Sequence, residues 1–464
     1  MTSHGNSMVT DLTQGKVLPL LLRFSLPLFV SNALQGVYNL VDMIIVGQWV
    51  GEAGMSAVSI GGDLLHLLTF LAMGFSSAGQ VLIAHDVGVK DRDAVNRMIG
   101  TMSSFLLGTS VVLSLVCFFL KEPILLLLHT PDESWRYTMD YTVTCIVGLF
   151  FIYGYNTVSA ILRGMGDSKR PFLFIAIAAI LNIILDLVFV VLCGMEVFGA
   201  ALATVIGQGV SFLYSVFYLW RKQESFGFAF RPESFRIDRP SFSRLLSLGI
   251  PMAIQSAAVT FSKIVLMAWI NQEGVTYSAL AGIYNKTGMI AGIVSNSFTA
   301  AGSTMIGQNL GAREYRRIPH VLLIILVIGL ILTVPASLFT LFFSPTLFRA
   351  FTGDQEVLDA AFILVVPIIL NLFGCATRSV AFALINGSGN TRLNLAVALL
   401  DGLLSRIGLA ALFGFVLEMK CEGFWYGDAL AGFVPFLIGV TYYLSGRWKR
   451  EKDVLPPEEP EVSP

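Results

Sequence analysis

Long apolar runs dominate the pattern of hydrophobic and polar positions along the chain. A run of about 18 apolar residues with few charges is long enough to cross a bilayer as a helix. Several runs exceed about 25 residues, which predicts tilted helices or helices that extend beyond the hydrocarbon layer. Twelve spans are predicted, at 17–47, 54–86, 94–120, 134–163, 171–193, 198–221, 243–271, 277–309, 317–343, 355–386, 393–416 and 423–446.

The first apolar run carries a stripe of polar residues. On a helix its members lie on one face, because they are spaced at i, i+4, i+8 and i+11. A carboxylate at bilayer depth costs about 2.5–3.5 kcal/mol on insertion scales. No Lys or Arg in this segment could neutralise it, so a proton or a bound cation is expected to do so. The stripe consists of Ser31, Gln35, Asn39 and Asp42.

Spans four to six contribute further carboxylate, amide and hydroxyl groups. Hard cations prefer oxygen ligands, and two nearby carboxylates can share a proton. The alternative is interhelical hydrogen bonding that only holds the bundle together, and this is the better interpretation for one buried Asn or Thr. The acids favour a functional site, because acids inside the membrane are functional by default. The residues are Tyr141 and Asn156, Asn182 and Asp186, and Thr204, Gln208 and Ser211.

The two halves of the chain repeat each other. Four pairs of similar motifs occur in the same order at offsets between 223 and 228 residues, which is the signature of an internal duplication. The pairs are 26–27 with 250–251, 83–91 with 306–314, 162–169 with 385–392, and 198–203 with 426–431. Six spans per unit give both units the same orientation. We therefore predict an all-α membrane protein with two six-helix bundles, related by a pseudo-two-fold axis along the membrane normal, and a cavity between them.

Positive charge predicts the orientation of the chain. Most Lys and Arg residues outside the spans lie on the side of both termini, which places the termini in the cytoplasm. The first span is expected to be retained, since the N-terminus lacks the pattern of a signal peptide. The predicted parts are a cytoplasmic segment at 1–16, lobes at 17–221 and 243–446, a cytoplasmic linker at 222–242, and a disordered tail at 447–464. The linker interleaves Phe and Arg, so it lies on the headgroups or is simply solvated.

The second half does not repeat the acidic positions of the first. Asp42 corresponds to Leu266 and Asp186 to Leu409, so ion coupling is expected in the first half. The second half carries four cationic residues inside its spans instead: Lys263, Lys286, Arg378 and Arg406. Arg378 could pair with Asp401 as a gate or as a structural bridge, and the structural pair is favoured because buried charges are usually paired.

Composition supports a membrane protein and excludes several enzyme classes. Hydrophobic residues make up 55% of the chain and charged residues 13%, against about 25% charged residues in a typical soluble domain. The five cysteines show no CxxC spacing, which argues against a disulfide framework. The chain contains no GxSxG, HExxH or Walker A motif, so no enzymatic activity is expected. Nucleic acid is not an expected partner.

Four segments resemble the multidrug and toxic compound extrusion (MATE) family. They are QGVYNLVDMIIVG at 35–47, LRGMGDSKRP at 162–171, NIILD at 182–186 and FGAALATVIGQ at 198–208. The resemblance covers roughly residues 15–446 and points to the prokaryotic branch with carboxylates in the N-terminal lobe. It implies a V-shaped twelve-helix fold with two lobes, and it places the cation site on Asp42, Asn182, Asp186 and Thr204. Tyr141 and Asn156, with Gln35 and Asn39, are accessory polar positions.

The expected function is that of a secondary active antiporter. The resemblance implies alternating access and export of organic, often cationic, amphipathic compounds in exchange for Na⁺ or H⁺, with no cofactor besides the coupling ion. We expect a monomer in the cell (inner) membrane, with a small organic molecule and the bilayer as partners. Another branch of the family has acids in spans seven and ten, where this chain carries Lys263 and Arg378. The alternative is a flippase for lipids or lipid-linked saccharides, whose anionic substrates would favour such cations.

Overall fold

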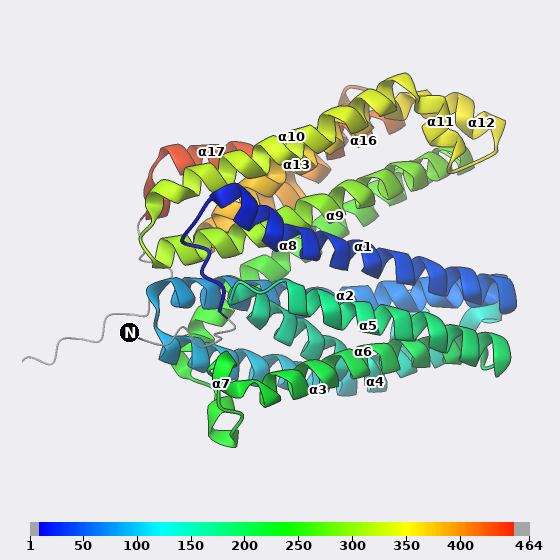
Figure 1. Ribbon diagram of the computed structural model, residues 1–464. Coiled ribbons are helices and arrows are strands. Elements are labelled where there is room, and N and C mark those ends of the chain that lie inside the picture. The colour runs from blue at the N-terminus through cyan, green and yellow to red at the C-terminus, as the bar shows by residue number, and fades with distance from the viewer. Residues whose placement is uncertain (1–8, 450–464) are drawn as a thin grey trace, which may run out of the picture. The chain divides into compact units, whose positions relative to one another are not determined.

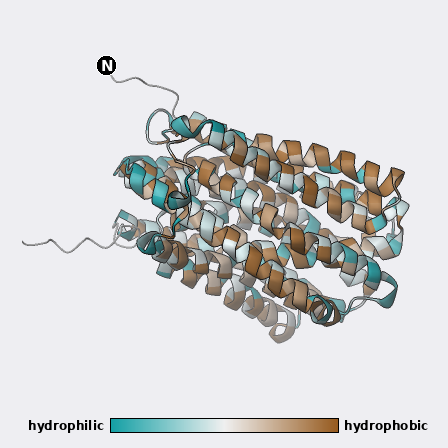
Figure 2. Ribbon diagram, turned by 90° about the horizontal axis from the view of Figure 1, so that it is seen from below, coloured by the Kyte–Doolittle hydropathy of each residue, from teal (hydrophilic) through white to brown (hydrophobic). Residues whose placement is uncertain are grey.

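The computed structural model describes residues 9–449, and within them every regular element is helical. The first eight residues of the predicted N-terminal segment lie outside the described part of the chain, as does the predicted disorder of residues 450–464. Twelve helices in the described residues are long and apolar enough to cross a membrane. Hydrophobic residues dominate the long helices, and hydrophilic residues gather at their ends and in the connections (Figure 2). The prediction of an all-α polytopic membrane protein is confirmed.

The chain divides into two compact units. Among the described residues, unit 1 comprises residues 9–11 and 26–249, and unit 2 comprises residues 12–25 and 250–449. Each unit boundary inside a helix lies next to a proline, at Pro27 in the first span and at Pro251 in the seventh. A proline inside a helix removes one backbone hydrogen bond, so both helices are weakened where they pass from one unit to the other.

Unit 1 contains the first span from residue 26 onward and the whole of spans two to six. Within this unit α4 packs against α2, α3 and α6, and α5 packs against α6 (Figure 1). The π-helical turns of η1 continue α5. The elements are α1 (Val17–Trp49), α2 (Glu52–Val89), α3 (Arg92–Leu127), α4 (Asp132–Gly164), α5 (Lys169–Asp186), η1 (Leu187–Leu192), α6 (Glu196–Arg221), α7 (Gln223–Phe226) and η2 (Pro232–Phe235).

Unit 2 contains the seventh span from residue 250 onward and the whole of spans eight to twelve. Here α13 packs against α9, α10, α16 and α17, and shorter helical turns interrupt its later spans. The elements are α8 (Arg239–Asn271), α9 (Val275–Gly311), η3 (Tyr315–Arg317), α10 (Ile318–Phe342), α11 (Ser344–Arg349), α12 (Gln355–Ala360), η4 (Ala361–Leu364), α13 (Val365–Gly387), α14 (Thr391–Leu399), η5 (Leu400–Ser405), α15 (Arg406–Ala411), η6 (Leu412–Val416), α16 (Lys420–Ala431), α17 (Val434–Leu444) and η7 (Arg447–Lys449).

The sequence repeat reappears in the local structure. Asp167 accepts hydrogen bonds from the backbone N–H groups of Lys169 and Arg170, while Asn390 caps α14 by accepting from Leu393 N–H. These side chains satisfy otherwise unpaired N–H groups at a helix start. They occupy equivalent positions, so both halves begin their fifth span in the same way. The π-helical segments η1 and η6 also recur at matching positions, and hydropathy alone does not predict them.

Two features of unit 1 differ from the sequence expectations. The third span, predicted at 94–120, extends through Pro123 to Leu127, so the short apolar stub after residue 120 continues this helix. The segment between the lobes packs on α3, so it is not simply solvated. Phe226 and Phe228 are buried, and a Cβ at Gly100 would collide with the Ser234 carbonyl oxygen. This close approach explains why a glycine stands at that position.

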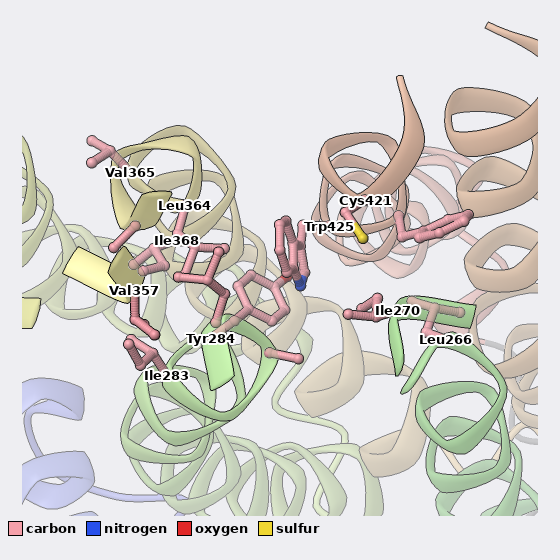
Figure 3. Packing of buried hydrophobic residues seen from close by; sticks show 14 of the residues in the cluster. Leu266, Ile270, Ile283, Tyr284, Val357, Leu364, Val365, Ile368, Cys421 and Trp425 are labelled. Carbon is pink, nitrogen blue, oxygen red and sulfur yellow. The ribbon is translucent and has the colours of Figure 1, made fainter. Parts of the chain in front are cut away.

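Each unit has its own apolar core. In unit 1, Val46, Ala57 and Val197 belong to a buried cluster that joins α1, α2 and α6. In unit 2, Trp425 and Tyr284 lie among aliphatic side chains of α8, α9 and α13 (Figure 3). Close packing of this kind fixes the rotation of each helix about its axis. The rotation decides which polar side chains enter the interior of the unit.

Candidate functional site

Two buried carboxylates in unit 1 form the centre of the candidate site. Asp42 lies on α1 and is 5% exposed, and Asp186 ends the regular part of α5 and is fully buried. The two groups are electrostatic neighbours. Within residues 9–449 neither of them forms an ion pair. Two carboxylates therefore share the interior of unit 1 without a fixed positive charge.

An amide and a hydroxyl accompany the acids. Asn182 Nδ2 donates a hydrogen bond of 3.3 Å to Thr204 Oγ1, which joins α5 to α6. Within the described chain, Asp42 Oδ1, both carboxylate oxygens of Asp186 and Asn182 Oδ1 are buried without a hydrogen-bond partner. A buried polar atom without a partner is costly, and four such oxygens from neighbouring residues indicate a site that a ligand completes.

The donor set determines the kind of ligand. Carboxylate, amide and hydroxyl oxygens are ligands for hard cations, and no soft sulfur or imidazole ligand is needed. A proton held by one of the two carboxylates would also remove the burial cost. Asp42, Asn182, Asp186 and Thr204 therefore have the chemistry to hold either Na⁺ or a proton.

The predicted accessory residues differ in their surroundings. Tyr141 is buried and is an electrostatic neighbour of Asp42. Gln35 is half-buried beside Tyr38. Asn156 instead donates to the Ile152 carbonyl oxygen of its own helix at 2.8 Å, and Asn39 is exposed. The structure thus brings Tyr141 to Asp42, whereas Asn156 bonds within α4 and Asn39 is exposed.

Tyr38 belongs to the buried surroundings of the acids, although the polar stripe does not include it. Its hydroxyl accepts a 3.3 Å hydrogen bond from Gln208 Nε2 and lies near Asp42. Cys145 on α4 is another buried neighbour of Asp42. Tyr38 could have been found from the sequence, because it precedes Asp42 by four residues and so lies on the same helical face.

Unit 2 holds a buried network of charges instead of an unpaired acidic pair. Arg378 on α13 pairs with Asp401. Arg406 pairs with Asp428 and also lies 3.5 Å from Asp401. The Tyr284 hydroxyl donates to the second carboxylate oxygen of Asp428 at 2.9 Å. Each acid of this network is neutralised by at least one arginine, unlike the acids of unit 1.

The sequence pattern singles out only part of this network. Arg378, Asp401 and Arg406 are visible as charges inside apolar spans, whereas Tyr284 and Asp428 need the tertiary contacts. Asp428 could have been found as an acid inside the last apolar span, because Arg406 in the preceding span had no assigned partner. Lys263 and Lys286 are both exposed and form no ion pair within the described chain.

Twelve spanning helices in two units, with polar groups buried inside each unit, define a polytopic membrane protein. Solved structures share this fold. The crystal structure of MATE in complex with MaD3S matches with a TM-score of 0.85 at 22% identity, covering 96% of this chain and 99% of that chain. A MOP superfamily transporter from Pyrococcus furiosus, described as having a binding pocket of reverse polarity, matches with a TM-score of 0.85 at 21% identity, covering 97% of this chain and 100% of that chain.

Sequence comparisons identify the family. The MatE family profile matches residues 27–188 and again residues 251–412, so the chain belongs to the MATE family of multidrug efflux transporters. The "Probable multidrug resistance protein YoeA" of Bacillus subtilis is 26% identical over 436 residues, 92% of this chain and 94% of that protein. The "FAD transporter" of Shewanella oneidensis is 26% identical over 361 residues, 75% and 77%. The double match agrees with the repeat, and the family assignment confirms the resemblance drawn from the sequence.

Proposed function

We propose that this protein is a secondary active antiporter that exports small organic compounds in exchange for inward movement of Na⁺ or H⁺. The coupling ion binds in unit 1, at Asp42, Asn182, Asp186 and Thr204. The observation that carries the proposal is the pair of buried carboxylates without a fixed cationic partner. The names of the relatives support a role in drug resistance and transport.

Ion binding couples to transport through a difference in affinity between conformations. A ligand shifts a conformational equilibrium only as far as it binds one state more tightly than the other. With no ion, two buried carboxylates repel each other and lack hydrogen bonds. With an ion, they gain ligands and the helices α1, α5 and α6 are drawn together. The conformation that permits this contraction is stabilised, and alternating access follows from the ion entering on one side and leaving on the other.

The cellular setting completes the proposal. The protein acts as a monomer in the cell membrane with both termini in the cytoplasm, in agreement with the distribution of Lys and Arg outside the spans and the positive-inside rule. Its cargo is organic and amphipathic, and cationic compounds are included because unit 1 contributes buried acids. No cofactor other than the coupling ion takes part.

The test is transport by the purified full-length protein in proteoliposomes. Ethidium uptake is measured under an imposed Na⁺ gradient and, separately, under an imposed H⁺ gradient. Asp42→Asn should abolish the gradient-driven component while the protein still inserts and folds. Asp93→Asn is the matched control, because Asp93 is an exposed carboxylate in the first turn of α3. Ion-dependent uptake that persists in Asp42→Asn would overturn the proposed site, and wild-type uptake that responds to neither gradient would overturn antiport.

A further inference from the structure

Lys263 lies near the buried charge network of unit 2 but has no carboxylate partner. The two acids of this network, Asp401 and Asp428, already pair with arginines. Lys263 lies on α8 and is exposed, and its charged neighbours are Asp428, Arg406 and Arg378. One carboxylate oxygen of Asp428 forms an ion pair with Arg406, and the other accepts a hydrogen bond from the Tyr284 hydroxyl. Lys263 forms no ion pair among residues 9–449, so the network leaves its charge uncompensated.

Close packing between α8 and the π-helical segment η5 holds Lys263 near the network. The hydroxyl of Ser262, the preceding residue, donates to the Gly402 carbonyl oxygen. A Cβ at Gly402 would lie 2.5 Å from the Ala258 side chain, so only glycine permits this approach. Gly402 directly follows Asp401 in the sequence. The backbone of α8 at Lys263 is therefore held against η5, the segment that carries the buried Asp401.

Arg378 is the second cation with donors to spare. One of its terminal nitrogens is used by Asp401, and its guanidinium lies over the Phe382 ring at 5.1 Å. Its side chain is 17% exposed, whereas that of Arg406 is 4% exposed. A guanidinium has five N–H donors in a planar fork, and Asp401 can take only some of them. Arg378 thus presents donors at the edge of the network, while Arg406 is enclosed within it.

The count of charges shows what the network lacks. Lys263, Arg378 and Arg406 are cationic, and Asp401 and Asp428 are the acids that face them. The cations exceed the acids by one. Both cations lie in helices long and apolar enough to span a membrane, where an uncompensated charge is costly. An anionic group that contacts the exposed Lys263 and the partly exposed Arg378 would balance the surplus charge. A lysine and an arginine together give charge and directional donors to such a group.

We propose that Lys263 and Arg378 form an anion-recognition site in unit 2, which holds the carboxylate of an exported organic anion or zwitterion. The inference rests on the proposed function in one respect: it takes the ligand of this site to be the compound that the protein exports. It extends the cargo from cationic compounds to compounds that carry a carboxylate. A carboxylate is favoured because its single charge matches the surplus of one cation.

Binding to the full-length protein in detergent micelles tests the site without an ion gradient. The probes are rhodamine 110, which carries a free carboxyl group, and its methyl ester rhodamine 123, which shares the same cationic ring system. Fluorescence anisotropy gives Kd for each dye. The wild type should bind the acid more tightly than the ester. Lys263→Gln should weaken binding of the acid about tenfold, as expected for loss of a charge-assisted hydrogen bond, and leave binding of the ester within about twofold.

Two further variants separate a specific site from general effects. Lys263→Glu should reverse the preference, so that the ester binds more tightly than the acid. Lys286→Gln is the matched control, because Lys286 is another exposed, unpaired lysine inside a span of unit 2. It should leave both Kd values unchanged. Substitution of Arg378 is avoided, since it would leave Asp401 buried with a weaker partner.

Two results would overturn the anion site. One is a wild type that binds the acid no more tightly than the ester, and the other is a Lys263→Gln variant that loses both dyes equally. Failure of the antiport proposal would appear elsewhere, in the dependence of ethidium flux on the ion gradients. The two proposals can therefore fail independently.

Discussion

The side-chain amide of Asn182 donates a 3.3 Å hydrogen bond to the hydroxyl of Thr204, and this bond leaves Asn182 Oδ1 buried without a partner in the described chain. The amide is thus oriented with its N–H group toward α6 and its oxygen available to an ion. Asn182 precedes Asp186 by one helical turn, so this oxygen and the carboxylate lie on one face of α5. In the proposed ion site, this hydrogen bond orients the amide oxygen before an ion binds.

Thr204→Val should weaken binding of the coupling ion. Valine has nearly the same shape as threonine but removes both the acceptor for the Asn182 amide and one oxygen ligand. The loss of one such hydrogen bond is worth about 1–1.5 kcal/mol, which is about a tenfold higher ion concentration for half-maximal transport. The measurement is the ion dependence of ethidium efflux in proteoliposomes. Thr441→Val, at an exposed threonine bonded within its own helix, is the control, and an equal effect of both changes would contradict the assigned role of Thr204.

Asp186→Asn should remove the stabilisation that the coupling ion gives to the folded protein. A ligand that binds only the folded state stabilises it by about 2.7 kcal/mol at one hundred times its Kd. Thermal unfolding in detergent is followed while Na⁺ is titrated and, in a second series, while the pH is lowered. The wild type should respond to the ion that it couples, and the variant should respond to neither at this site. A variant whose Tm still rises as much as that of the wild type would show that the ion binds elsewhere.

Arg406→Met should strongly destabilise unit 2. The change leaves Asp428 without its arginine and removes one of the two arginines near Asp401. Removal of one partner of a buried ion pair costs about 3–5 kcal/mol. The thermal unfolding temperature should fall accordingly, and the double variant Arg406→Met/Asp428→Asn should recover part of the loss. Arg349→Gln, at an exposed arginine, should leave the temperature unchanged, and a similar result for Arg406→Met would refute a structural role.

Gly61→Ala should disturb the packing beside the acidic pair, whereas Gly62→Ala should not. A Cβ at Gly61 would lie 2.4 Å from the Tyr141 ring, and a Cβ at Gly62 would meet nothing within 4 Å. Overpacking of this kind costs about 1–3 kcal/mol, while alanine at an open helical position gains up to about 1 kcal/mol over glycine. Because Tyr141 neighbours Asp42, Gly61→Ala should also weaken coupled efflux.

The two glycine variants are compared by thermal unfolding and by ethidium efflux on the same preparations. Equal unfolding temperatures for Gly61→Ala and Gly62→Ala would show that Tyr141 moves aside at no cost. In that case its position next to Asp42 would not be fixed by packing against α2.

The sequence by itself determined the class of the protein, its spans, its internal repeat and its family. These follow from hydropathy and from motifs that are local in the chain, and such signals do not depend on how helices pack. Asp42 and Asp186 could be identified in the same way, because an acid inside an apolar span stands out in any arrangement. The first-half location of the unpaired acids also followed from comparing the two repeats.

Tertiary structure decided which polar groups meet. Asn39 and Tyr38 lie three and four residues before Asp42, on the same side of α1, yet Asn39 is exposed and Tyr38 is buried near Asp42. The stripe of a helix spans a wide angle, so the sequence cannot set the rotation of the helix, which depends on packing against α2, α4 and α6. Arg406 likewise finds Asp428 on another helix, and no spacing within one helix predicts a partner that only the assembled bundle brings within reach.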